Sequence, residues 1–170
     1  MMKKILALVL ALLTLLSCVS CIGGKVYEAA DAEFSANGIT LTLTKAFKEV
    51  DAATYGYTAA FDSAAVAVFA LKESFSLVNS LGATSKTAYA ELLRSANAAR
   101  NPGELKTEDG IVFFEYNFHN TDENVTYSYF TTVHEGKDAY WMVQFATKQA
   151  DYDEYRPYLL KWAKTVNVNG

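Results

Sequence analysis

Three strand-like segments in the C-terminal half most constrain how this chain can fold. They cover residues 111–119, 125–135 and 139–147, and each is rich in the β-branched and aromatic residues that favour strands. The polar stretch 120–124 separates the first two. Gly136-Lys137 suits a tight type II′ hairpin between the last two, because Gly tolerates a positive φ. Short connections of this kind join antiparallel neighbours. The sequence therefore predicts an antiparallel three-stranded meander.

The turns also predict which side chains share a face of this meander. A two-residue turn at 136–137 places Phe130 opposite Val143, and a longer turn over 120–124 places Phe114 opposite Phe130. One face then carries apolar core residues, namely Val112, Phe114, Tyr116, Phe118, Phe130, Trp141, Val143 and Phe145. A slip of one residue would exchange the two faces, so the assignment depends on the turns.

The opposite face is aromatic but interleaved with hydrogen-bonding groups. It supplies our candidate ligand-binding residues, Glu115, Asn117, Tyr127, Tyr129, Tyr140 and Gln144. Apolar walls with a few polar groups are typical of a groove for a small ligand or peptide. The alternative interpretation is a half-solvated sheet face, with packed tyrosine rings and solvated hydroxyls.

The rest of the chain adds strands and two helices. Alternating or continuous apolar patterns predict strands at 39–44, 55–61 and 65–71, whereas 73–83 fits neither type. Ser85 can cap a helix that ends at Asn101-Pro102-Gly103, and a last helix is expected from about Asp153 to Val166. Helices should cover the apolar face of the meander, so we expect the α/β (α+β) class.

The N-terminus reads as an export signal. Lys3 and Lys4 precede an apolar run, 5–13, that is too short to span a bilayer. Leu15-Leu16-Ser17-Cys18 resembles the bacterial lipobox, which makes Cys18 the expected lipid attachment site. Cys21 is the alternative, and an ordinary secretory signal is the other interpretation. We expect a lipoprotein signal peptide at 1–17, a lipid-anchored tether at 18–37 and a single domain at 38–170, held at the cell membrane on the exported, extracytoplasmic side.

Composition excludes several kinds of site. The body after Cys21 contains no cysteine, so it can have no internal disulfide, Cys-ligated zinc or thiol nucleophile. Loss of residues 1–17 would leave 13 basic against 19 acidic residues, a net charge of about −6. An acidic body argues against nucleic acid as a partner, because phosphate contacts need clustered Lys and Arg.

No motif for catalysis or metal binding stands out. His119 and His134 are the only histidines, and the predicted register directs them to opposite faces. The acidic residues lack EF-hand spacing, and nucleophile-elbow, P-loop and dinucleotide-binding patterns do not occur. We therefore predict no catalytic residues, no metal site and no cofactor.

The order and texture of the elements resemble the Mog1/PsbP-like superfamily, and most closely its DcrB-like bacterial lipoproteins. The segments that carry the resemblance are 38–42, 66–73, 89–93, 113–116, 141–146 and 166–168. It implies an α/β/α sandwich with a central, mainly antiparallel sheet of about six strands flanked by helices. It also implies a non-catalytic accessory or partner-binding role, without transferring any site residue.

Together these observations favour an exported, lipid-anchored, non-enzymatic binding or accessory module. Its partners would be the membrane, through the N-terminal lipid, and a cell-envelope protein or small ligand. The alternative is a small-ligand or peptide receptor that uses the Tyr-rich sheet face, and a hydrolase is the least favoured hypothesis, because clustered acids, bases and nucleophiles are missing.

Overall fold

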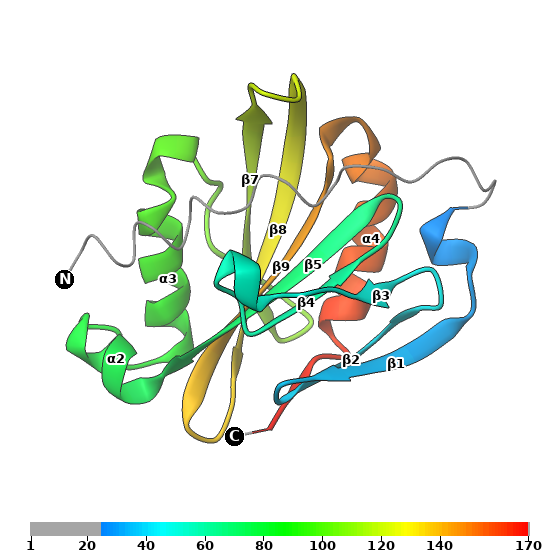
Figure 1. Cartoon of the computed structure of the whole chain (residues 1–170). Coiled ribbons are helices and arrows are strands. Elements are labelled where there is room, and N and C mark those ends of the chain that lie inside the picture. The colour runs from blue at the N-terminus through cyan, green and yellow to red at the C-terminus, as the bar shows by residue number, and fades with distance from the viewer. Residues whose placement is uncertain (1–24, 170) are drawn as a thin grey trace.

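The computed structural model describes residues 25–169, which form two antiparallel sheets (Figure 1). The larger sheet has seven strands in the order β3-β4-β5-β9-β8-β7-β6. Its strands are β3 (Lys48–Glu49), β4 (Ala59–Asp62), β5 (Val66–Ser74), β6 (Lys106–Glu108), β7 (Ile111–Asn120), β8 (Val125–Glu135) and β9 (Ala139–Lys148). The smaller sheet has the order β1-β2-β10 and comprises β1 (Asp31–Ala36), β2 (Ile39–Thr44) and β10 (Asn167–Val168).

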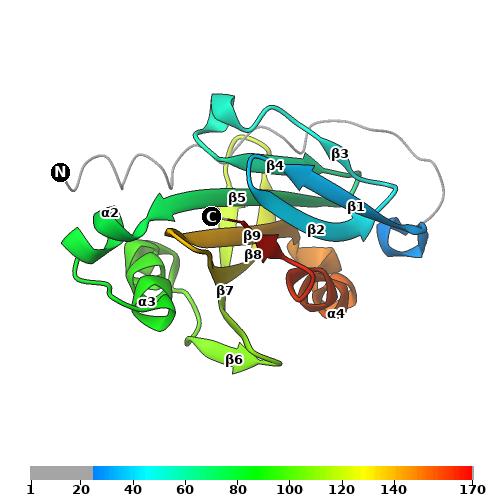
Figure 2. The ribbon, with the colours of Figure 1, turned by 90° about the horizontal axis from the view of Figure 1, so that it is seen from below.

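Helices cover both faces of the large sheet, which confirms the predicted sandwich. The α-helices are α2 (Phe75–Ser80), α3 (Lys86–Ala96) and α4 (Tyr152–Ala163). Short 3-10 turns lie at η1 (Val26–Glu28), η2 (Ala53–Tyr55), η3 (Ala98–Arg100) and η4 (Gln149–Asp151). Figure 2 shows α3 and α4 on opposite sides of β7, with the small sheet above α4. The ambiguous stretch 73–83 contains the end of β5 and α2, which Ser74 caps by accepting a hydrogen bond from Leu77 N.

Each face of the large sheet has its own hydrophobic core. On the α4 side, Leu159 and Trp162 pack with Phe113 and Phe130 of the sheet, and Leu41 of the small sheet completes this core. The α3 side is richer in tyrosine. Tyr89 and Leu93 of α3 lie against aromatic side chains of the strands, which include Phe114, Tyr116, Tyr127, Tyr129 and Tyr140. Burial on both faces explains why the central strand β9 is apolar almost without alternation.

The observed register reverses the two faces of one strand, β7, relative to the predicted meander. The β8–β9 hairpin turns at 137–138, so Phe130 pairs with Phe145, a shift of two that preserves the faces. The β7–β8 loop has four residues, 121–124, rather than five, and Phe114 pairs with Thr131. A shift of one moves every side chain of β7 to the other face. The prediction that Phe114 shares a face with Phe130 is therefore wrong.

Folded structure begins earlier than the predicted domain start at residue 38. Val26 is buried, and Phe34 of β1 packs edge-on against Phe61 with ring centroids 5.6 Å apart. The β1–β2 hairpin turns at Asn37-Gly38, where both residues have positive φ. The segment 26–37 is therefore part of the domain and not a tether. The predicted signal peptide, Cys18 and Cys21 lie outside the described residues. Within 25–169, no helix combines the length and the apolar character needed to cross a membrane.

Candidate functional site

The six candidate ligand-binding residues divide between the two faces of the sheet. Tyr127, Tyr129, Tyr140 and Gln144 lie on the α3 side, where each is 3–5% exposed. Glu115 and Asn117 lie on the α4 side, because β7 has the opposite parity to the prediction. The Tyr-rich face is therefore not an open groove.

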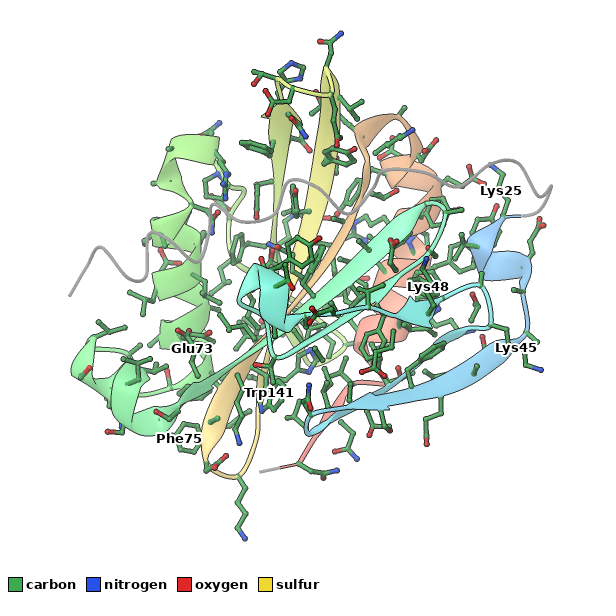
Figure 3. The ribbon with its side chains drawn as sticks, viewed as in Figure 1. Lys25, Lys45, Lys48, Glu73, Phe75 and Trp141 are labelled. Carbon is green, nitrogen blue, oxygen red and sulfur yellow. The ribbon has the colours of Figure 1, made fainter. Side chains whose placement is uncertain are left out.

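Aromatic packing accounts for the buried tyrosines. The Tyr116 and Tyr129 rings stack with centroids 4.8 Å apart, and Tyr140 stacks on Tyr89 of α3 at 5.4 Å. The Tyr89 hydroxyl donates to Glu73, 2.5 Å away. Figure 3 places Glu73 and Phe75 next to α2, on the side of the sheet that α3 covers. Burial raises the pKa of Tyr116 to about 12, so its hydroxyl stays protonated at neutral pH.

Gln144 is likewise a structural residue in this core. Its Nε2 donates to the Tyr116 hydroxyl and to Thr131 Oγ1, both at 2.8 Å. Buried polar groups are normally satisfied in this way, because an unpaired group loses its hydration without compensation. These bonds occupy Gln144 within the core.

A hollow of about 670 Å³ lies on the other side, where β7 approaches the start of α4. Most of its lining is polar or charged, and it includes both remaining candidates. The lining includes Glu115, Asn117, Arg100, Asn101, Tyr152, Asp153 and Arg156. In Figure 1 the end of β7 and the start of α4 both lie in the upper half of the molecule, with β8 drawn between them. This hollow is the candidate site.

Glu115 is the centre of its hydrogen-bond network. One carboxylate oxygen accepts from the Tyr152 hydroxyl at 2.5 Å and from Arg156 Nε at 2.8 Å. The other accepts from Lys106 Nζ at 3.3 Å, and Arg156 also reaches Glu108 at 3.3 Å. Two elements distant in sequence, β7 and α4, are joined by these charge-assisted bonds.

These partners determine the charge of Glu115. Burial by itself raises the pKa of the carboxyl, but the bonds from Tyr152 and Arg156, together with the positive charge of Arg156, outweigh it and lower the pKa overall. Glu115 is therefore an anion at neutral pH. An acid with a lowered pKa is a weak proton acceptor, which makes this carboxylate a poor general base.

Arg100 forms the wall of the hollow on the α3 side. Its guanidinium lies 4.9 Å from the ring centroid of Phe118 and 5.7 Å from that of Tyr116. It also donates to Asn97 Oδ1 at 2.6 Å. Aromatic rings attract cations placed over their faces, so this arrangement positions the guanidinium at the rim of β7.

On the α4 side, Pro157 affects the wall of the hollow. Proline carries no N–H, so the Asp153 carbonyl four residues earlier lacks its usual i→i−4 helical donor. Asp153 lines the hollow. Its carbonyl and carboxylate are therefore hydrogen-bond acceptors at the beginning of α4.

The histidines show no catalytic arrangement. Both lie on the α4 face, at opposite ends of the hairpin, which corrects the predicted opposite faces. His134 contacts Thr132 Oγ1 at 3.0 Å, but that hydroxyl donates to the Val143 carbonyl and is buried. His119 contacts Thr126 Oγ1 at 3.1 Å as an exposed cross-strand pair. Within residues 25–169, neither histidine pair is hydrogen-bonded to the Glu115 network.

Sequence reasoning missed the α4 part of the site. Tyr152 and Arg156 are spaced four residues apart, so they share a face of the helix. The last helix is expected to cover the sheet, so an arginine on it indicates a partner carboxylate on one of the strands. The one-residue error in register concealed it, because Glu115 was placed on the opposite face.

Comparison with known proteins adds evidence on the fold. No protein-family model matches the sequence, and no curated protein matches it. Among solved structures, cyanobacterial PsbP (CyanoP) from Synechocystis sp. PCC 6803 superposes with a TM-score of 0.54 over 88% of this chain and 98% of that protein. The chain has the Mog1/PsbP-like fold. Sequence identity to CyanoP is 14%, so the comparison shows the fold alone.

A second solved structure supports the same architecture. A protein from Bacteroides thetaiotaomicron VPI-5482 matches with a TM-score of 0.51 and 10% identity over 81% of this chain. The match covers 48% of that protein, which therefore contains a large part with no counterpart here. The resemblance to DcrB-like lipoproteins stays a prediction.

Proposed function

We propose that this chain is an exported, lipid-anchored accessory module that binds a cell-envelope protein and catalyses no reaction itself. The observation that carries the proposal is the hollow beside β7. Its volume of about 670 Å³ falls in the usual range for binding sites, and its lining supplies several hydrogen-bonding groups at the surface.

The charges of the hollow favour binding over catalysis. Glu115 is held as an anion by Arg156, and Arg156 is shared with Glu108. Catalytic acids and bases need a pKa near the working pH, and these partners move the Glu115 pKa away from it. The network therefore suits a rigid recognition surface more than proton transfer.

The N-terminal sequence supports export and anchoring. A basic start and an apolar run precede Cys18 in a lipobox-like context. Attachment of a diacylglycerol would supply two chains, and two chains are needed for stable anchoring of a soluble domain. The extracytoplasmic face of the cell membrane is therefore the proposed location, and a protein of the envelope is the proposed partner.

Site-specific photo-crosslinking in cells tests the binding function. A photoreactive amino acid at Asn101, an exposed residue on the rim of the hollow, should yield a covalent adduct with an envelope protein. The matched control places the same group at Lys137, an exposed residue in the β8–β9 turn. Adducts of the same proteins in the same yield at both positions would contradict the proposal. An adduct with a small molecule alone would favour the receptor alternative.

A further inference from the structure

We propose that the open edge of β7 takes up an extended peptide segment of a partner protein, which adds one strand to the large sheet. The pairing would occur along residues 116–120, at the margin of the hollow. This inference rests on the proposed binding function and specifies how the hollow holds its partner.

The backbone of β7 supplies the first part of the argument. β6 pairs with β7 only along 111–113, and Gly103 N then donates to the Glu115 carbonyl at 2.8 Å. In an antiparallel ladder the N–H and C=O of one residue point to the same side, and this side alternates along the strand. Asn117 and His119 therefore direct their backbone groups to the same edge as Glu115. Within residues 25–169, no strand pairs with this part of the edge.

The chain itself leaves this edge at the hollow. Gly103 approaches β7 so closely that a Cβ there would lie 3.3 Å from the Glu115 carbonyl oxygen. Before it, Pro102 has no N–H to donate, and Asn101 has a left-handed φ of 50° that turns the backbone away. An incoming peptide would thus extend the line of β6. At ~3.3 Å per residue, the five residues 116–120 offer roughly 16 Å of edge.

The shape of the site favours a single peptide over a second copy of this chain. Asn101 forms one wall of the hollow and Asp153 of α4 forms another, so the β7 edge lies between them. Paired strands approach to ~4.8 Å. Two copies would each have to fit past the walls of both hollows, whereas an isolated extended segment meets only one set of walls.

The charges predict how such a peptide is recognised. The lining contains two cations, Arg100 and Arg156, and two anions, Glu115 and Asp153, so it has no net preference for either sign. Strand addition obtains affinity from main-chain hydrogen bonds, and side-chain pockets add specificity. We therefore expect affinity that changes little with ionic strength, unlike the binding of a small anion to a cationic site.

The test begins with selection of random linear heptapeptides from a display library, with the full chain as bait. Peptides selected in this way should lose at least tenfold in affinity when Asn117→Pro removes the outward N–H of β7. Glu33→Pro is the matched control, because the β1 register directs the Glu33 backbone to the open edge of the small sheet. It introduces the same residue on another open edge and should leave affinity unchanged. Thermal unfolding of both variants shows whether either has lost its fold.

A second measurement needs no protein variant. N-methylation of successive residues of the selected peptide should abolish binding at every other position, because alternate N–H groups face β7. Sensitivity without this two-residue period would overturn strand addition. So would the absence of enriched peptides, or binding that Asn117→Pro leaves intact. A dimer in sedimentation that Asn117→Pro dissociates would assign the edge to a second copy and overturn the peptide assignment.

The two proposals can fail separately. If crosslinking at Asn101 yields an envelope protein but no peptide is selected, the hollow binds its partner by another mode. If peptides bind with the expected period but no adduct forms in cells, strand addition holds and the proposed cell-envelope partner is wrong.

Discussion

Substitution of Glu115 by alanine should destabilise the domain more than any change to its exposed salt bridges. The residue accepts two strong bonds, from Tyr152 at 2.5 Å and from Arg156 at 2.8 Å, and its side chain is 21% exposed. Hydrogen bonds to charged groups contribute about 1.5–3 kcal/mol each. Arg156 would keep Glu108, and the Tyr152 hydroxyl could bond water in the hollow. We therefore expect a net loss of about 2–3 kcal/mol, which is less than the total of about 3–6 kcal/mol for the two bonds.

Urea unfolding with an unchanged m-value measures this loss directly. A loss of 2–3 kcal/mol corresponds to a decrease in Tm of roughly 5–10 °C for a domain of this size. Glu108→Ala is the matched control, because Glu108 is the other partner of Arg156 and its own side chain is 46% exposed. Exposed pairs contribute under about 1 kcal/mol. Equal losses for the two variants would refute the central role given to Glu115.

The same network has a pH signature. Because folding lowers the pKa of Glu115, its contribution is present above the unfolded pKa and is lost as pH falls through the folded value. The stability difference between the wild type and Glu115→Gln should therefore shrink below about pH 4.5, the ordinary value for Glu. A difference that stays constant from pH 7 to pH 3 would contradict the assigned ionisation.

Three further results are expected. Gln144→Met should cost about 1–3 kcal/mol in urea unfolding, because it leaves two buried hydroxyls without their donor. The His134 imidazole should titrate near pH 4 by NMR, since burial lowers its pKa to about 4 from 6.5. The free energy of unfolding should then decrease as the pH is lowered from about 6.5 to 4, and His134→Gln should weaken this pH dependence. Cys18→Ser should abolish labelling by radioactive fatty acid while Cys21→Ser retains it; the reverse pattern would move the anchor.

Much of the fold could be predicted because its strands have strong local signals. The segments 111–119, 125–135 and 139–147 correspond to β7, β8 and β9 within a residue or two, and the last helix lies where its apolar spacing indicated. β1 was missed because its sequence, Asp31-Ala-Glu-Phe-Ser-Ala36, is short and weakly apolar. The Asn37-Gly38 pair that follows is a strong hairpin signal and could have revealed it.

The candidate site could be predicted only in part, and the reason is geometric. The sequence identifies Glu115 and Asn117 as candidates, but the face of the sheet on which they lie depends on the length of the β7–β8 loop. Asn124 adopts a left-handed φ of 53°, which closes the β7–β8 loop with four residues instead of five. Local sequence does not distinguish a four-residue loop from a five-residue loop, and this difference moves every side chain of β7 to the other face of the sheet.

The early start of the fold shortens the linker between the proposed lipid anchor and the domain. Lys25 pairs with Glu154 of α4, and Tyr27 stacks on Tyr158 with centroids 4.0 Å apart. In the lipid-anchored state, seven peptide units would then link Cys18 to Lys25, a reach of at most about 25 Å. Glu154 lies in the first turn of α4, the turn that also supplies Asp153 to the hollow, so the linker ends at the helix that borders the proposed binding site. A partner segment tethered to the same membrane would meet that site at a high effective concentration, which would allow a weak main-chain contact to suffice.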